Sequence, residues 1–191
     1  MGEILERPRA PARHRLDVDA YYKMAEAGIL THSDRVELID GEIIDMTAIG
    51  SPHAAVTNRL NRLLVPAVEG LVLVSVQSPL RLDAYNEPEP DLMLLRPRPD
   101  DYRARHPGAA DVLLLIEVSE SSSAYDRTAK LALYAKFAVA EVWIVDVSGA
   151  AIEVYREPAH DAYAVKHRLT HGSLAPALVP GIAIGVAALF T

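Results

Sequence analysis

The sequence predicts an α/β fold in which helices flank a mixed β-sheet, with an N-terminal helix and β-hairpin as an extension. Two segments, 111–119 (DVLLLIEVS) and 141–147 (EVWIVDV), are almost continuously apolar, as strands covered on both faces are. One helical segment, 124–138, joins them in a βαβ-like order. Within residues 36–46, the pair Asp40-Gly41 separates two short apolar runs and is a strong hairpin signal. Together these patterns predict a mixed sheet with helices on both faces.

The remaining elements follow from local signals. Residues 1–15 lack periodicity, which predicts a flexible N-terminal arm. Residues 16–191 are predicted to form one domain. Gly28 ends a first helix over residues 16–30. Ser51-Pro52 opens a second helix that runs to about Glu69 and stops at Gly70. Apolar runs predict further strands at 71–77, 79–83 and 91–95 and a final hairpin from 151–157 and 162–168.

Composition limits the classes of function. The chain has 191 residues and no cysteine, which excludes disulfides, thiolate metal sites and cysteine nucleophiles. No apolar run reaches the roughly 18 residues of a membrane span, and the charged N-terminus lacks a signal-peptide core, so we expect a cytoplasmic protein without a membrane partner. The formal net charge of −7 argues against a protein that coats nucleic acid through bulk charge.

Two carboxylates stand at the ends of strongly apolar segments. Asp91 follows Glu-Pro-Glu-Pro and precedes four large apolar residues, and Glu117 follows the five apolar residues 112–116. Open α/β sheets place their sites at such strand ends. A carboxylate there must be paired, protonated or bound to a cation. For Glu117 an ordinary salt bridge to an arginine is the alternative.

A lysine on the next helix faces the wrong way for a solvated residue. At about 100° per residue, Lys130 falls within the apolar arc of the helix, between Tyr134 and Phe137, whereas Lys136 points to the opposite face. Asp126, one turn earlier, falls in the same arc. Lys130 therefore either extends outward along the helix to reach water or places its ammonium among carboxylates.

If Asp91, Glu117 and Lys130 converge, they form a site for metal-dependent hydrolysis. Two carboxylates are enough to hold Mg²⁺ or Mn²⁺, since Mg²⁺ keeps several waters and takes substrate phosphate oxygens as further ligands. A lysine beside the cation can orient or deprotonate a water, or stabilise charge that develops on the phosphate. The hypothesis is that Asp91 and Glu117 bind the cation.

Several motifs together resemble the Uma-two family of restriction-endonuclease-like proteins, in the PD-(D/E)XK nuclease superfamily. The resemblance covers about residues 17–190 and is carried by VELIDGEI (36–43), SPH (51–53), EPDL (89–92), LLIEVSESS (114–122) and YDRTAKLALYAKFAVAEVWIVD (125–146). It implies a restriction-endonuclease-like core of helix, three strands, helix and strand, and Mg²⁺-dependent endonuclease activity.

The resemblance also implies roles for individual residues. Asp91 and Glu117 would be metal ligands, and Glu37 would be an additional acidic catalytic position. The superfamily usually has its lysine two residues after the second acid, where this chain has Ser119. The Uma-two family instead has its lysine on the following helix, at Lys130.

Other polar residues are candidates for supporting roles. His53 could reach substrate phosphate or a metal-bound water, or could be a packing contact at the helix start. Asp126 could orient Lys130, and Gln77 and Ser119 could face the same cleft. An arginine-rich loop offers candidate phosphate contacts, with a solvated loop as the alternative: Arg96, Arg98, Arg103 and Arg105.

The leading functional hypothesis is an endonuclease that cuts DNA with Mg²⁺ or Mn²⁺. One alternative is a non-catalytic binding or assembly module on a nuclease-like fold, which the net charge and the lack of a recognised DNA-reading motif favour. Another is a hydrolase of a small phosphorylated substrate, with the arginine loop as a phosphate clamp. Because cutting both strands of a duplex needs two sites, we expect a homodimer.

Overall fold

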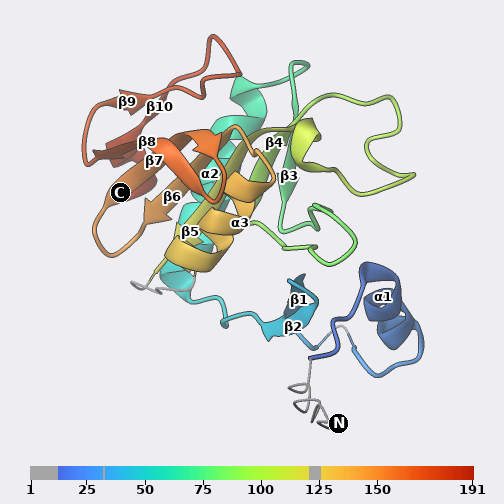
Figure 1. Cartoon of the computed structure of the whole chain (residues 1–191). Coiled ribbons are helices and arrows are strands. Elements are labelled where there is room, and N and C mark those ends of the chain that lie inside the picture. The colour runs from blue at the N-terminus through green and yellow to red at the C-terminus, as the bar shows by residue number, and fades with distance from the viewer. Residues whose placement is uncertain (1–12, 32, 121–125) are drawn as a thin grey trace, which may run out of the picture.

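The computed structural model describes residues 13–31, 33–120 and 126–191. For residues 126 and 127 it describes the backbone only. Its centre is a six-stranded sheet in the order β3-β4-β5-β6-β7-β8 (Figure 1). Strands β5 and β6 are parallel, and the other neighbouring pairs are antiparallel. The mixed sheet that the sequence predicts is therefore present. Its strands are β3 (Leu73–Val76), β4 (Leu92–Leu95), β5 (Val112–Ser119), β6 (Glu141–Asp146), β7 (Ala151–Ala159) and β8 (Ala162–Leu169).

Helices cover both faces of this sheet. Helix α2 (Ser51–Ala67) packs on one face, where its Leu60 and Leu64 share a core with Leu114 and Ile116 of β5. Helix α3 (Leu131–Lys136) and the loop between β4 and β5 cover the other face, and Figure 1 shows the two helices on opposite sides of the sheet. Neighbouring residues of a strand point to opposite faces of the sheet, and both faces are covered here. Every residue of β5 is therefore buried, which explains its continuous apolar sequence.

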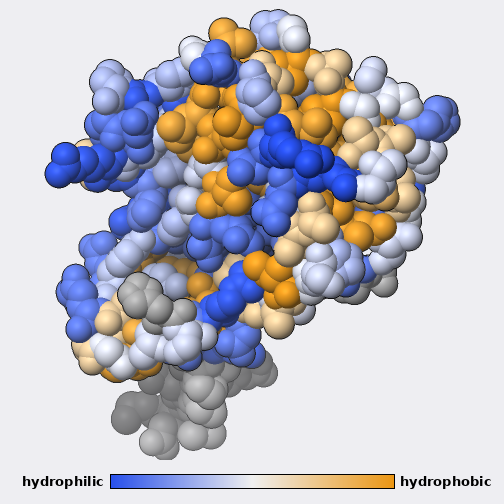
Figure 2. Space-filling model, turned by 180° about the vertical axis from the view of Figure 1, so that it is seen from behind, coloured by the Kyte–Doolittle hydropathy of each residue, from blue (hydrophilic) through white to orange (hydrophobic). Residues whose placement is uncertain are grey.

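The N-terminal extension consists of α1 (Val18–Glu26) and the hairpin β1 (Val36–Ile39) and β2 (Glu42–Asp45). The hairpin turn has φ of 50° at Asp40 and 76° at Gly41. Two positive φ values in succession are what a two-residue turn of the Asp-Gly type requires. The backbone N–H of Glu87 donates to the carbonyl of Leu38 at 2.8 Å and ties the hairpin to the body. From behind, a hollow with mostly hydrophilic walls separates the extension from the body (Figure 2).

The structure corrects one predicted strand. Residues 79–83 pair with no strand; instead the chain doubles back, and the N–H groups of Leu80 and Leu82 donate to the carbonyls of Pro88 and Asn86, each at 2.9 Å. Leu80 is fully buried, so the apolar alternation of this segment reflects burial of a loop. Proline at position 79 has no N–H for a ladder.

The ends of the helices also differ from the predicted bounds. Helix α1 stops at Glu26, before Gly28. The turn before α3, Asp126–Lys130, is π-helical. The C-terminal segment adds a small sheet, β9 (Ser173–Leu174) with β10 (Ile184–Gly185), and a 3₁₀ turn at Val186–Leu189. These residues extend the core beneath α2.

Most of the predicted N-terminal arm, residues 1–12, lies outside the described part of the chain. The two arginines that follow contact the hairpin: Arg13 pairs with Glu42 at 2.8 Å and Arg15 with Asp40 at 3.4 Å. None of the helices in the described ranges combines the length and the apolar character that crossing a membrane needs.

Candidate active site

A cavity of about 310 Å³ opens at one end of the central sheet. Strands β4 and β5 are antiparallel with Leu92 opposite Ile116, so the residue before β4 and the last residues of β5 meet at the same end. The hairpin β1–β2 and the start of α2 close the cavity from the other sides. It brings together six of the residues singled out from the sequence: Glu37, His53, Asp91, Glu117, Ser119 and Lys130.

Asp91 is held in place through one of its two carboxylate oxygens. Its Oδ2 accepts a hydrogen bond from the backbone N–H of Val118 at 2.8 Å and lies 3.1 Å from Nε2 of His53. The hydrogen bond to Asp91 raises the pKa of His53, although burial of the ring opposes this. His53 lies in the first turn of α2, where Ser51 and Pro52 start the helix, so the helix start positions the ring against Asp91.

Glu117 lies on the α3 face of β5, two residues before the strand ends. Its Oε1 accepts a hydrogen bond from the hydroxyl of Tyr134 at 2.6 Å and lies 2.9 Å from Nζ of Lys130. Burial raises the pKa of Glu117 to about 7, and the nearby Asp91 charge adds to the rise, while Lys130 and Tyr134 oppose it. The carboxyl is thus poised between its two protonation states near neutral pH.

Lys130 enters the cavity from the turn before α3. Its side chain is 5% exposed, and Nζ also lies 3.2 Å from Oε2 of Glu37. The same oxygen of Glu37 accepts the backbone N–H of Glu89 at 3.1 Å. Glu37 belongs to β1, so the hairpin extension completes the surroundings of the ammonium. Lys130 therefore does not extend outward to water; it joins a carboxylate of the extension to a carboxylate of the central sheet.

Other predicted residues lie elsewhere or have no described side chain. Gln77 is exposed and does not line the cavity; its backbone N–H donates to the carbonyl of Asp91 at 2.9 Å. The side chain of Asp126 lies outside the described residues. Ser119 ends β5, is buried and lines the cavity.

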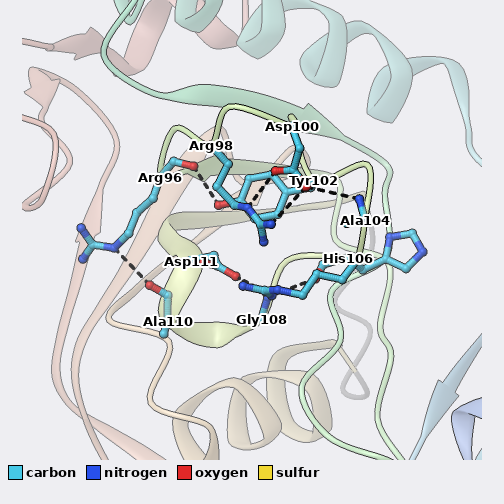
Figure 3. Close-up of polar contacts among 10 residues, drawn as sticks. Arg96, Arg98, Asp100, Tyr102, Ala104, His106, Gly108, Ala110 and Asp111 are labelled. Atoms are coloured by element: carbon cyan, nitrogen blue, oxygen red, sulfur yellow. Dashed lines mark hydrogen bonds and ion pairs between the residues drawn. The ribbon is translucent and has the colours of Figure 1, made fainter.

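The arginine loop also lies away from this cavity, since none of its four arginines lines it. Figure 3 shows that Arg98 pairs with Asp100 within the loop itself, at 3.0 Å. Arg105 likewise pairs with Asp111, at 3.1 Å. Arg96 donates to the carbonyl of Ala110 at 3.1 Å. Arg103 is exposed. The structure thus separates the four candidate phosphate contacts from the carboxylates.

Four charged residues of the cavity were not singled out from the sequence: Arg35, Asp45, Glu89 and Glu120. Burial raises the pKa of Glu89, and Arg35 opposes the rise. Arg35 lies two positions before Glu37, and Glu89 lies two positions before Asp91, so the two-residue period of extended chain places each beside a predicted residue. That period was the signal available in the sequence.

Asp91 and Glu117 are the residues whose chemistry fits a divalent cation. Contacts with described residues reach only Oδ2 of Asp91 and Oε1 of Glu117, and the second oxygen of each carboxylate faces no hydrogen-bond partner there. Within the described ranges, no group of three or more His, Cys, Asp or Glu side chains is arranged to hold a metal. A cation between these two carboxylates would thus complete its shell with water and substrate oxygens, as Mg²⁺ commonly does.

Comparison with known proteins gives a consistent picture of the fold. A putative nuclease belonging to DUF820 from Anabaena variabilis ATCC 29413 has a similar structure, with a TM-score of 0.71 at 15% identity over 92% of this chain and 97% of that chain. The type IIG restriction endonuclease BpuSI matches with a TM-score of 0.38 at 13% identity, over 62% of this chain and 14% of its own. That score is too low to support an argument. No curated protein matches the chain.

A family model decides the relationship. The model described as "Uma2: Putative restriction endonuclease" matches residues 18–187, and this range contains the extension, the central sheet and every residue of the cavity. Since the match spans most of the 191 residues, the chain belongs to the Uma2 family.

Proposed function

We propose that the protein is a metal-dependent endonuclease that hydrolyses phosphodiester bonds of DNA. The main support is that Asp91, Glu117 and Lys130 share one cavity, in a chain whose family is described as a putative restriction endonuclease. Asp91 directly precedes β4, Glu117 lies near the end of β5, and Lys130 comes from the π-helical turn before α3.

Each residue has a distinct role in this proposal. Asp91 and Glu117 would hold Mg²⁺ or Mn²⁺, and the cation when bound would supply a Lewis acid for phosphate oxygens and an activated water. Lys130 stabilises the negative charge that develops on the phosphate. Because its ammonium contacts two carboxylates, charge stabilisation suits it better than removal of a proton from water.

The other cavity residues hold these groups in position. His53 orients Asp91, and Glu37 orients Lys130 from the opposite side. Arg35 is exposed at the wall of the cavity. It is placed to contact a substrate phosphate. The arginine loop lies too far from this cavity to make that contact.

Nicking and linearisation of a supercoiled plasmid, with Mg²⁺ or Mn²⁺ present, test the proposal. The wild-type protein is expected to cut, and Glu117→Gln and Lys130→Met are expected to lose most of this activity. Lys136→Met is the matched control, because Lys136 lies in the adjoining helix α3 and is exposed. Circular dichroism checks that each variant is folded.

The absence of cleavage of duplex, nicked and single-stranded DNA with either cation would contradict the proposal. Calorimetry then distinguishes the alternatives. A binding or assembly module would show no Mn²⁺ binding that depends on Asp91. A hydrolase of small phosphoesters would bind Mn²⁺ and be inhibited by nucleotides more strongly than by DNA.

A further inference from the structure

A second cavity, of about 620 Å³, lies between the N-terminal extension and the body. Tyr21 and Tyr22 of α1 line it on one side, and Glu87, Glu89 and His106 line it on the other. Glu89 also lines the first cavity, which holds Asp91 and Glu117 and is called the carboxylate cavity below. The two cavities are therefore neighbours. Nothing in the proposed cleavage reaction uses this second cavity, whose volume is in the range of ordinary ligand pockets.

Glu87 has a buried oxygen without a partner. The residue is 4% exposed, and its Oε1 accepts a hydrogen bond from the hydroxyl of Tyr22 at 2.6 Å. Its Oε2 is buried and has no hydrogen-bond partner among the described residues. A buried acceptor left unpaired destabilises the protein, and more so when it is charged. A ligand that donates a hydrogen bond to Oε2 would remove this destabilisation.

The charge around the cavity selects the sign of such a ligand. Three acidic residues line it: Asp34, Glu87 and Glu89. Hydrogen bonds from the backbone and hydroxyl of Thr31 lower the pKa of Asp34, which keeps that carboxylate charged. Among the described lining residues, only His106 can carry a positive charge. Anions are therefore repelled and cations are attracted.

Aromatic rings provide the rest of the wall. Tyr21 and Tyr22 meet edge to face with centroids 5.9 Å apart, and Tyr22 stacks on His106 at 6.4 Å with an interplanar angle of 14°. Tyrosine rings attract cations and also pack against apolar groups. The complementary ligand thus carries N–H donors on a positive head group and has a short apolar stem.

We propose that this cavity binds an organic cation that ends in a guanidinium or ammonium group, with Oε2 of Glu87 accepting a hydrogen bond from that group. Two sources share this chemistry: a free alkylamine or alkylguanidine, and an arginine or lysine side chain presented by another protein. The proposal is independent of cleavage at the neighbouring cavity.

Three probes with the same butyl stem test the ligand class by calorimetry and by NMR: n-butylguanidinium, n-butylammonium, and n-butylurea, whose head group is neutral and nearly the same shape as guanidinium. The two cations are expected to bind and the neutral urea is not. Glu87→Gln is expected to weaken binding of the guanidinium at least tenfold, in keeping with loss of a charged hydrogen-bond acceptor. Its side-chain oxygen can still accept from Tyr22, so the variant is expected to fold.

A second variant and two controls keep the test decisive. Asp34→Asn removes one negative charge from the cavity at an exposed position. It is expected to weaken binding of the cations by a smaller factor than Glu87→Gln does. Glu157→Gln, an exposed acid on β7, is expected to leave binding unchanged. Asp91→Asn is also expected to leave it unchanged, and this separates the cation pocket from the proposed nuclease site.

The source is decided by a further pair of ligands, agmatine and a capped tripeptide with a central arginine. Binding of agmatine supports a free cation, and binding of the peptide alone supports a protein side chain. Equal binding of butylurea and butylguanidinium, or unchanged affinity in Glu87→Gln, would overturn the proposal. So would a crystal structure of the protein soaked with butylguanidinium that shows only water at Oε2.

Discussion

The ammonium of Lys130 is almost removed from water, and the carboxylates of Glu37 and Glu117 that it contacts are buried with it. Such a cluster persists because each charge has a partner at short range. Removing one partner leaves the others buried and uncompensated, which is far more costly than the net stabilisation that the intact cluster provides. The residues of the proposed site are therefore also sensitive points for stability.

Lys130→Met is expected to lower the free energy of unfolding by about 3 kcal/mol, because it leaves the buried carboxylates without the ammonium group that compensates their charge. Denaturant unfolding followed by circular dichroism measures this loss. Adding Glu117→Gln in the same chain is expected to restore part of the stability without restoring DNA cleavage. Equal stability of the wild type and the single variant would contradict this account of the cluster.

The protonation of Glu117 predicts a pH dependence of metal binding. Its pKa of about 7 means that a cation must displace a proton below that pH. Mn²⁺ affinity is therefore expected to rise with pH up to about 7 and then level off. Tyr134→Phe removes a hydrogen bond that lowers the pKa of Glu117, so it is expected to move the midpoint to higher pH.

Calorimetric titration with Mn²⁺ over a pH series measures the midpoint, and Tyr163→Phe is the control because its hydroxyl bonds to the carbonyl of Val139 outside the cavity. An affinity that does not change with pH would contradict the prediction. The contribution of Glu117 to the stability of the fold changes with pH in the opposite direction. The folded protein retains the proton of Glu117 above the ordinary pKa of 4.5, so this group's contribution to stability falls as pH rises from about 4.5 to about 7.

At the scale of elements, Glu141 joins the central sheet to the C-terminal segment. It is buried in β6 and opposite Arg156 of β7. Nη2 of Arg156 lies 2.7 Å from Oε1 of Glu141 and also donates to the carbonyl of Ala175 at 3.0 Å. The backbone N–H of Ala177 donates to Oε2 of Glu141 at 2.6 Å. Together these bonds hold the C-terminal segment against β6 and β7.

Arg156→Met is expected to lower the free energy of unfolding by about 2 kcal/mol, because Glu141 loses a charged donor. It is also expected to speed hydrogen exchange of the backbone around Ala177, measured by mass spectrometry. Arg168→Met is the comparison, since Arg168 pairs with Glu153 and Asp146 instead. It should leave exchange near Ala177 unchanged. Similar exchange in the two variants would argue against the proposed role of Arg156.

At the scale of the whole molecule, negative charge is expected to govern the approach of the proposed DNA substrate. The chain has a formal net charge of −7, and the carboxylate cavity is lined by more acids than bases. Phosphates are repelled by such a surface unless cations neutralise it. Binding of DNA is therefore expected to be weak without a divalent cation and stronger with one.

The double variant Asp91→Asn/Glu117→Gln removes two of these charges while keeping the side-chain shapes. It is expected to bind a short DNA duplex several-fold more tightly than the wild type when both are free of metal, as measured by fluorescence anisotropy. The added cation should then increase its affinity less. Tighter metal-free binding by the wild type would count against DNA as the substrate of this cavity.

Assembly remains a prediction at the same scale. Cleavage of both strands of a duplex requires two sites, so a homodimer is expected in solution. Sedimentation equilibrium of the full chain measures its mass directly. A monomer at all concentrations would imply that the protein nicks one strand at a time.

The sequence by itself determined the fold class and much of the local structure. Continuous apolar runs identified β5 and β6, and the Asp-Gly pair identified the hairpin turn, because these signals depend on neighbouring residues alone. The phase of the apolar arc pointed Lys130 toward the sheet, although the turn that contains it is π-helical. The family resemblance named the same lysine and the two carboxylates.

Only the tertiary structure decided which charged groups meet. It brought Glu37 of the extension to Lys130, added Arg35 and Glu89 to the cavity, and bound Arg98 and Arg105 to aspartates of their own loop. It also showed that residues 79–83 are a buried loop. Periodicity reports the face on which a side chain lies, but contacts between distant segments depend on how the strands align and how the loops close, and local sequence does not encode either.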